Sequence, residues 1–403
     1  MSLICLNCVS DTALHKLLSG KTTDANCSYC KKSGLTIEMI DLAEIVDKYL
    51  REYCCFGEEI RRFDRDDDNV EYVQEGYPLN ELLQEELEIE YEPAIDLEKI
   101  LVEKDPANYG DGDSQFYDRF QNYERKRLSS FEYDEIWREF SDGIKHERRF
   151  FHETTRSKLE LIFGIQNSAI ASELPIIEVG RDTPIKDISR ARRADSETEA
   201  EIFLDNPERE LSAPESKKAT AGRMNPAGIV MFYGALSENT AIAEIRPSVG
   251  SLAVVAQFKM TRKLRLLDLS RIGSGFTGSL FDPAYENRTA RLQFLRSFHA
   301  LIARPIQPCD ELLEYLPTQA VAEYISSILN LDGILYASAQ VGSIPDKEEV
   351  NYSGLSEEEL KLYNVVLFGV VLDSLMYIEN SARLVRVTGV NYRWSIDYGL
   401  SDD

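Results

Sequence analysis

Two sets of side chains in this sequence have types and spacings that suit a chemical task. The first set is four cysteines in two pairs, Cys5-x-x-Cys8 and Cys27-x-x-Cys30. Each pair presents two thiolates from one tight turn, and two such pairs complete the tetrahedral four-sulfur site that zinc prefers. Four protein ligands leave no coordination position for water, so we expect structural zinc and no catalysis at this site. His15 lies between the pairs, and we expect it to be an ordinary loop or helix residue.

The second set combines an arginine, a tyrosine and a glutamate. The segment Gly-Arg-Met-Asn-Pro-Ala-Gly at 222–228 predicts a turn, and the apolar run after it predicts a strand that ends at Tyr233. Ser237 is a typical helix N-cap residue, so Glu244 is expected about two turns into the next helix. Arg223, Tyr233 and Glu244 would then face one cleft. The spacing alone favours a more ordinary interpretation, in which these residues are a turn arginine, a strand tyrosine and a solvated helix glutamate.

The elements that would position this second set belong to a mixed domain that begins near residue 174. Short β-branched or aromatic runs predict strands, and longer stretches between them predict helices. The predicted strands are 229–233, 252–258, 264–268, 333–336, 365–371 and 384–387, and the predicted helices are 238–245, 287–303 and 318–329. This irregular order predicts an α+β fold with a largely antiparallel core. No phosphate-binding loop motif of the form Gly-x-x-x-x-Gly-Lys-Ser/Thr occurs.

The residues before this domain predict two further parts. Residues 1–34 hold the cysteine pairs and are expected to form a zinc-ribbon-like module. Residues 35–168 are expected to be helical, because apolar residues recur three or four apart over 35–50 and again over 131–163, with a break near Gly143. The predicted domains are therefore 1–34, 35–168 and 174–403.

The C-terminal part resembles the RES domain, a family named for an arginine, a glutamate and a serine. The resemblance covers roughly half the chain, from about Ile188. It is carried in order by the 222–228 segment, by Phe232-Tyr233, by Thr-Ala-Ile-Ala-Glu at 240–244, and by Asp-Gly-Ile-Leu-Tyr-Ala-Ser at 332–338. A short Arg-x-Arg element of the family matches Arg190-Ala191-Arg192, and either arginine fits its role.

This resemblance implies an ADP-ribosyltransferase-like fold and an enzyme that degrades NAD at the nicotinamide–ribose bond. The acceptor would be water or inorganic phosphate, which makes the enzyme an NAD glycohydrolase or an NAD phosphorylase. Glu244 would stabilise the cationic ribose, and Arg223 with Arg190 or Arg192 would hold the phosphates. Tyr233 would pack on the nicotinamide or the ribose, and Ser338 would form one hydrogen bond near the reacting centre.

The N-terminal half resembles the HEPN-type helical domain that is often fused to RES domains. Nuclease members of that superfamily pair an arginine with a histidine at a defined spacing. The nearest match, Arg148-Arg149-Phe150-Phe151-His152, lacks this spacing. A structural or interaction role is therefore expected for this half.

The overall composition disfavours some classes of binding partner. The 403 residues carry a formal net charge of −25, which disfavours non-specific nucleic-acid binding because phosphate backbones are repelled. No apolar run reaches the roughly 18 residues of a membrane span, and no secretion signal is visible, so we expect a cytoplasmic protein. The family resemblance implies a growth-arresting toxin controlled by an Xre-type antitoxin or another regulatory protein. Two alternatives remain: a mono-ADP-ribosyltransferase that modifies a macromolecule, and a non-enzymatic interaction protein with an inactive RES fold.

Overall fold

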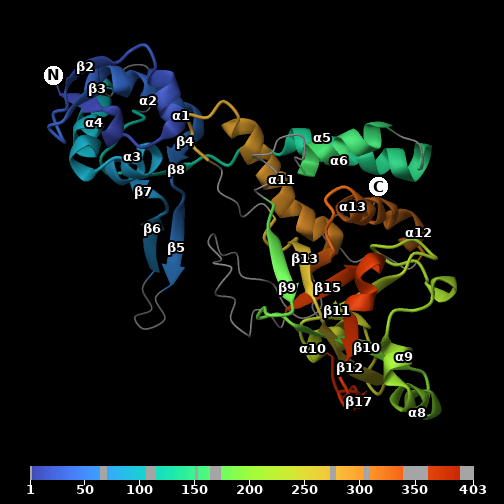
Figure 1. Ribbon diagram of the computed structural model, residues 1–403. Helices are drawn as coiled ribbons and strands as arrows, with labels where there is room; N and C mark the ends of the chain where they lie inside the picture. Colours follow the sequence, from blue (N-terminus) through green and yellow to red (C-terminus); the bar gives the residue numbers. More distant parts are fainter. Residues whose placement is uncertain are drawn as a thin grey trace, which may run out of the picture. The chain divides into compact units, whose positions relative to one another are not determined.

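The chain divides into two compact units in the computed structural model, which describes residues 2–63, 70–105, 115–149, 153–163, 174–272, 278–303, 306, 309–338 and 362–390. Unit 1 comprises Met1–Ser129 and Thr277–Ala290, and unit 2 comprises Ser130–Phe276 and Arg291–Asp403. The expected mixture of helices and sheets is confirmed (Figure 1). The division into 1–34, 35–168 and 174–403 stays a prediction. None of the helices in the described part of the chain is long and apolar enough to cross a lipid bilayer.

Unit 1 contains both helices and short strands. The cysteine pairs flank a three-stranded sheet of β1 (Leu3–Cys5), β3 (Ser33–Glu38) and β2 (Thr23–Asn26). The other strands are β4 (Cys54–Phe56), β7 (Tyr77–Pro78) and β8 (Asn122–Arg125), which form one sheet, and the hairpin of β5 (Glu59–Phe63) and β6 (Val70–Gln74). The helices are η1 (Leu6–Cys8), α1 (Thr12–Leu18), α2 (Met39–Tyr53), α3 (Leu79–Leu87) and α4 (Tyr91–Lys104). The segment that was expected to be helical therefore also contains strands.

The helix expected from residue 35 begins only at Met39. Leu35 and Ile37 belong to β3, which pairs with β1 on one side and with β2 on the other. The run Leu-Thr-Ile-Glu at 35–38 also alternates apolar and polar residues, which suits a strand. Backbone pairing on both sides decided between the two patterns.

Three residues from far along the chain complete the hydrophobic core of unit 1. Leu280, Phe281 and Tyr285 are at most 1% exposed and pack with the helices of this unit. The ring centroid of Phe281 lies 5.2 Å from that of Tyr49, and the centroid of Tyr285 lies 4.8 Å from that of Tyr53. The first 129 residues therefore need the segment at 278–290 to bury their apolar side chains.

Unit 2 is organised around one large sheet (Figure 1). Its strands run in the order β16-β12-β10-β11-β15-β14-β13-β9, with β17 also paired to β12, and every pair is antiparallel except β13 with β14. The strands are β9 (Ile176–Gly180), β10 (Asp187–Ala194), β11 (Met231–Ala235), β12 (Leu252–Met260), β13 (Lys263–Asp268), β14 (Gly333–Ala337), β15 (Tyr363–Phe368), β16 (Leu375–Tyr377) and β17 (Arg383–Arg386). The strand predicted over 365–371 ends at Phe368, where the short helix η4 (Gly369–Ser374) begins.

Helices cover both faces of this sheet. Val254 and Val255 are neighbours on β12 and therefore point to opposite faces. Val254 packs in a core that includes Phe203 of α8 (Glu197–Asp205), and Val255 packs with Ala241 of α10 (Glu238–Glu244). The remaining helices are α5 (Phe131–Asp142), η2 (Gly143–Glu147), α6 (Glu153–Phe163), α9 (Pro207–Leu211), η3 (Ser216–Lys218), α11 (Tyr285–Ala303), α12 (Glu311–Glu314) and α13 (Leu316–Ser327). The break expected near Gly143 is a π-helical turn, η2.

Candidate active site

The site forms where two strands of the unit 2 sheet part. β10 and β11 pair only at Ser189 and Ala235, whereas β11 pairs with β15 from Met231 to Ala235. Beyond that single pair, residues of both strands line a pocket of about 280 Å³. Its lining residues come from β10, β11, α10, β14 and β15, and they are Arg190, Ala191, Tyr233, Gly234, Ala241, Glu244, Ile245, Tyr336 and Asn364.

Glu244 is held in this pocket by two hydrogen-bond donors. Ser237 caps the first turn of α10 by accepting from the Thr240 backbone N–H at 3.2 Å, and Glu244 is the last residue of this helix. The Oγ of Ser338 donates to Glu244 Oε1 at 2.8 Å, and the Nδ2 of Asn364 donates to the same oxygen at 2.7 Å. Ser338 directly follows β14, and Asn364 lies on the neighbouring strand β15. The orientation of the Glu244 carboxylate is therefore set by the paired strands β14 and β15.

Arg190 contributes a buried positive charge to the pocket. Its guanidinium carbon lies 4.8 Å from the centroid of the Phe232 ring, and its Nη1 has no hydrogen-bond partner among the described residues. Burial, with a smaller effect from the charge of Arg192, lowers the pKa of Arg190 to about 10, so the group is still positive at neutral pH. A buried guanidinium nitrogen without an acceptor is costly, and an anionic ligand would satisfy it.

Arg192 lies in different surroundings. Its guanidinium carbon is 4.2 Å from the centroid of Phe203, and its Nη1 forms a 3.0 Å ion pair with Glu210. Its side chain is 45% exposed, and it is not among the residues that line the pocket. Of the two candidate arginines, the structure brings only Arg190 to the pocket.

Tyr233 connects the pocket to the 222–228 loop. Its hydroxyl donates to Asn225 Oδ1 at 2.7 Å and accepts from the Met224 backbone N–H at 3.1 Å. Burial raises the pKa of Tyr233 to about 12, so the phenol is neutral at physiological pH. A Cβ at Gly222 would lie 2.8 Å from the Tyr233 hydroxyl, which explains why glycine suits this position. The motif residues thus hold one another in place.

Arg223 lies next to this network but does not line the pocket. Its Nη1 donates to the backbone carbonyl of Ile302, near the C-terminal end of α11, and its guanidinium carbon is 5.4 Å from the ring centroid of Tyr315. Its positive charge is close enough to lower the pKa of Tyr233, although burial outweighs that effect.

Two pocket residues, Tyr336 and Asn364, were not predicted as site residues. Burial, assisted by the negative charge of Glu244, raises the pKa of Tyr336 above its usual range. Asn364 is 1% exposed, and its Oδ1 has no hydrogen-bond partner among the described residues. The available signal for Asn364 was an amide inside the otherwise apolar strand Tyr363–Phe368, where a buried polar group needs a reason.

The four predicted cysteines of unit 1 come together. Their sulfur atoms all lie within 4.8 Å of one another, with 3.5 Å between those of Cys5 and Cys30 and 3.9 Å between those of Cys8 and Cys27. A tetrahedral zinc site with Zn–S bonds of about 2.3 Å requires sulfur atoms about 3.8 Å apart, so the cluster fits that ion. His15 is not part of the cluster, and its Nε2 contacts the Val9 carbonyl oxygen. His152 lies outside the described residues.

Comparisons with known families identify two domains along the chain. Residues 191–369 match the RES domain, and residues 20–158 match HEPN/RES N-terminal domain 1. Neither a curated protein nor a solved structure matches the chain. The likeness to ADP-ribosyltransferases therefore stays a prediction. The first match begins next to Arg190 and includes Tyr233, Glu244, Ser338 and Asn364. The chain thus carries a RES domain in its C-terminal part, preceded by a HEPN/RES N-terminal domain 1.

Proposed function

We propose that the pocket at Glu244 binds NAD and cleaves its nicotinamide–ribose bond. The observation that carries this proposal is a glutamate held by Ser338 and Asn364 in a pocket that also contains the buried charge of Arg190. The RES domain match supports NAD as the substrate. The pocket volume of about 280 Å³ lies just below the range of about 300–1,000 Å³ for small-molecule sites, so the pocket would hold only the nicotinamide and ribose end. The rest of the dinucleotide would extend outside it.

Glu244 would stabilise the transition state. Breaking this bond generates an oxocarbenium-like ribose as neutral nicotinamide leaves. Both donors bind Oε1, and no hydrogen bond to Oε2 is seen in the described part of the chain. Oε2 would therefore contact a ribose hydroxyl, and the fixed negative charge would lie beside the developing cation. Ser338 and Asn364 act here as donors that orient Glu244, and Ser338 is not assigned the role of a nucleophile.

The other pocket residues would bind the substrate. Arg190 offers Nη1 to a pyrophosphate oxygen, for which a planar, charged guanidinium is well suited. The hydroxyl of Tyr233 is occupied by the 222–228 loop, so its ring is the part that would pack against the nicotinamide or ribose. Arg223 would act from beside the pocket, by holding the loop or by contacting the phosphates of bound NAD.

The decisive experiment is incubation of the purified protein with NAD, with and without inorganic phosphate, followed by mass spectrometry of the products. Free ADP-ribose would identify a glycohydrolase, and ADP-ribose 1″-phosphate would identify a phosphorylase. A modified macromolecule with little free product would instead identify a mono-ADP-ribosyltransferase. Unchanged NAD under all conditions would refute the proposal and favour a non-enzymatic interaction protein. The Glu244→Gln variant is the control for contaminating activity.

We infer further that NAD loss caused by this chain arrests growth in the cytoplasm, where a regulatory protein such as an Xre-type antitoxin would restrain it. Induction of the chain in bacteria should lower cellular NAD and stop colony formation. Induction of Glu244→Gln at equal protein level should do neither. Growth arrest by both proteins would show that the arrest does not depend on the proposed chemistry.

We also propose that the cysteine cluster of unit 1 holds one structural zinc ion. Four sulfur ligands would close the coordination sphere, so the ion would stabilise unit 1 and take no part in the reaction. Elemental analysis of the purified chain should find about one zinc per molecule, and Cys27→Ser should lose most of it. Cys309→Ser, at an exposed cysteine outside the cluster, is the matched control. A wild-type protein without zinc after metal-replete expression would contradict this assignment.

A further inference from the structure

Unit 2 contains another, larger cavity of about 860 Å³, which is lined in part by Met231 and Phe232 of β11 and shares no lining residue with the Glu244 pocket. Phe232 and Tyr233 are neighbours on this strand, so their side chains leave the sheet on opposite faces. Tyr233 lines the pocket at Glu244, and Phe232 lines the larger cavity. Met224 and Gly228, from the loop that holds Tyr233, form part of the cavity wall. The reaction proposed above assigns no role to any side chain that lines this cavity.

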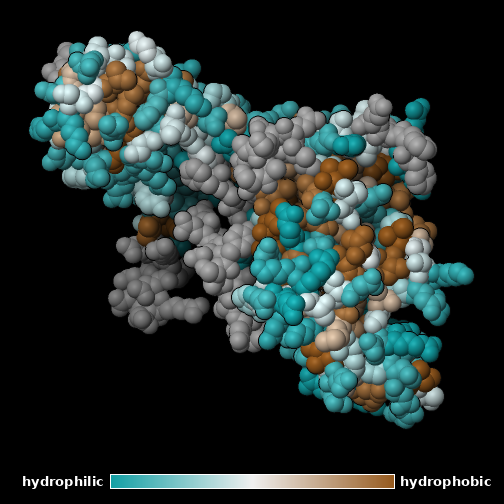
Figure 2. Space-filling model, viewed as in Figure 1, coloured by the Kyte–Doolittle hydropathy of each residue, from teal (hydrophilic) through white to brown (hydrophobic). Residues whose placement is uncertain are grey.

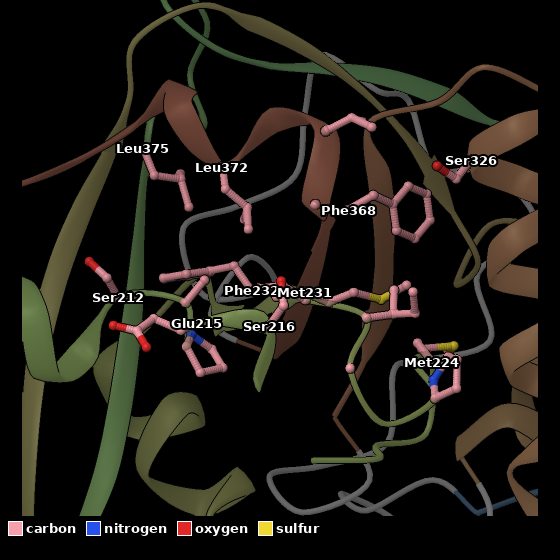
Figure 3. Close-up of a pocket in the computed structure, with 18 of the residues that line it drawn as sticks. Ser212, Glu215, Ser216, Met224, Met231, Phe232, Ser326, Phe368, Leu372 and Leu375 are labelled. Carbon is pink, nitrogen blue, oxygen red and sulfur yellow. The ribbon is translucent and has the colours of Figure 1, made fainter. Parts of the chain in front are cut away.

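The inner wall of the cavity is apolar. Met224, Phe232, Phe258 and Phe368 line it but are at most 1% exposed. The apolar surface open to a ligand therefore includes the half-buried Leu372 and Leu375. Figure 3 shows Leu372 and Leu375 on one side of the cavity and Glu215 with Ser216 on the other. Two methionines, Met224 and Met231, are among the lining residues, and methionine side chains adapt readily to the shape of a ligand.

Apolar surface continues from the cavity to the outside. Ile229 and Val370 belong to the lining, and they are 52% and 78% exposed. Hydrophobic residues are also gathered on the visible face of unit 2 (Figure 2). An apolar wall that reaches solvent indicates a ligand with a hydrophobic body.

Among the described residues that line this cavity, the charged ones are all acidic. Glu215, Glu323 and Asp373 belong to the lining and are exposed, and no lysine, arginine or histidine is among the lining residues that the structure describes. Lys218 lies 3.7 Å from the carboxylate of Glu215, which leaves Glu323 and Asp373 as the stronger source of negative potential. A ligand that bears a positive group beside its apolar body would complement both features.

We propose that this cavity binds a small amphipathic organic cation, that is, a molecule with an apolar body and a basic or quaternary ammonium group. The apolar body would lie against the accessible side chains of Ile229, Val370 and Leu372. The positive group would lie at the mouth, near Glu323 and Asp373. A volume of about 860 Å³ is within the range of about 300–1,000 Å³ for small-molecule sites.

The test is calorimetric titration of the full chain with three probes that share one alkyl tail: octyltrimethylammonium, octyl sulfate and octyl glucoside. We expect octyltrimethylammonium to bind at least tenfold more tightly than octyl sulfate, with octyl glucoside between them. Equal affinities for all three probes would overturn the proposal. Binding is measured without NAD, so the result is independent of the proposed reaction.

Two variants locate the binding. Ser326→Trp places a large ring in the cavity from α13 and should abolish binding, whereas Ser19→Trp, at an exposed position of unit 1, should not. The double variant Glu323→Gln/Asp373→Asn should remove most of the preference for the cation. The control Glu52→Gln/Glu85→Gln makes the same charge change at exposed positions of unit 1 and should keep that preference. Binding that survives Ser326→Trp, or an equal loss in both double variants, would show that the cation binds the acidic surface in general.

Discussion

In unit 1 the buried Glu86 pairs with the half-buried Arg125, whereas in unit 2 no ion pair joins the half-buried Glu244 and Arg190 among the described residues. Arg125 donates from Nε to Glu86 Oε1 at 2.6 Å and from Nη2 to Glu86 Oε2 at 2.8 Å. Its third nitrogen, Nη1, donates to the Gly278 carbonyl at 3.0 Å. In unit 2 the carboxylate of Glu244 is held by Ser338 and Asn364, and Arg190 keeps a nitrogen without a partner among the described residues.

The two regions differ in whether their charged side chains find all their hydrogen-bond partners within the protein. Both arginines lie over an aromatic ring, at 5.7 Å for Arg125 on Tyr285 and at 4.8 Å for Arg190 on Phe232, so the apolar surroundings are similar. The pair in unit 1 satisfies its charges internally, which suits a structural role. The pocket in unit 2 leaves a donor and an acceptor for something else. We therefore expect substitutions in unit 1 to change stability and substitutions in the pocket to change chemistry.

The largest effect is expected from Glu86→Gln. This change removes the negative charge that faces the half-buried Arg125 inside unit 1, and it should cost about 3–5 kcal/mol of unfolding free energy. Hydrogen-exchange mass spectrometry would localise the loss of protection to unit 1, and NAD turnover per folded molecule should be unchanged. The control is Glu85→Gln, at the exposed position next to it on α3. A loss below about 1 kcal/mol would mean that the pair is not structural.

The next largest effect is expected from Glu244→Gln, which should lower the activity and leave the stability nearly unchanged. Removing a preorganised charge from the reacting centre should lower the rate constant of NAD turnover by about 10²–10³-fold. The unfolding free energy should change by less than about 1 kcal/mol, because Gln keeps an oxygen that accepts from Ser338 and Asn364. Glu238→Gln, at the start of the same helix and outside the pocket, should keep its activity. Undiminished turnover in Glu244→Gln would remove this residue from the mechanism.

A smaller effect is expected from Arg190→Gln. A hydrogen bond to a charged group contributes about 1.5–3 kcal/mol, so the affinity for NAD should fall by about 10–100-fold. Stability should not decrease, since the variant removes a buried charge without an acceptor. Arg192→Gln is the matched control, because it lies two residues along β10 and already has Glu210 as its partner. If Arg192→Gln weakened NAD binding more, the assignment of the two arginines would be reversed.

The smallest effect is expected from Tyr233→Phe. Like the Glu86–Arg125 pair in unit 1, the Tyr233 hydroxyl already has its hydrogen-bond partners within the protein. Burial raises its pKa to about 12 from the ordinary value of 10.0. The folded state therefore holds the phenolic proton more tightly than the unfolded chain does. The resulting stability is fully present below pH 10 and is lost as the pH rises towards about 12. Between pH 8 and pH 11, the stability difference between wild type and Tyr233→Phe should shrink by about 1.4 kcal/mol. A constant difference would show that Tyr233 titrates normally.

Local sequence patterns were sufficient to predict many of the helices and strands. The helix at α10, the strands β12 and β13 and the break at Gly143 all follow from spacing over a few residues, and all are present. The error at Leu35 and Ile37 arose because their spacing suits both a helix and a strand. Pairing of β3 with β1 and β2, which a local pattern does not contain, selected the strand.

The sequence by itself determined the types of groups that are present. It predicted four thiolates at zinc-binding spacing and placed Tyr233 and Glu244 on a strand and the helix after it, because these features depend on neighbouring residues. Only the tertiary structure decided that Asn364 shares Glu244 with Ser338, that Arg190 lines the pocket while Arg192 pairs with Glu210, and that Phe281 completes the core of unit 1. Each of these outcomes joins residues distant in sequence or depends on which partner surrounds a side chain. Spacing along the chain does not contain that information.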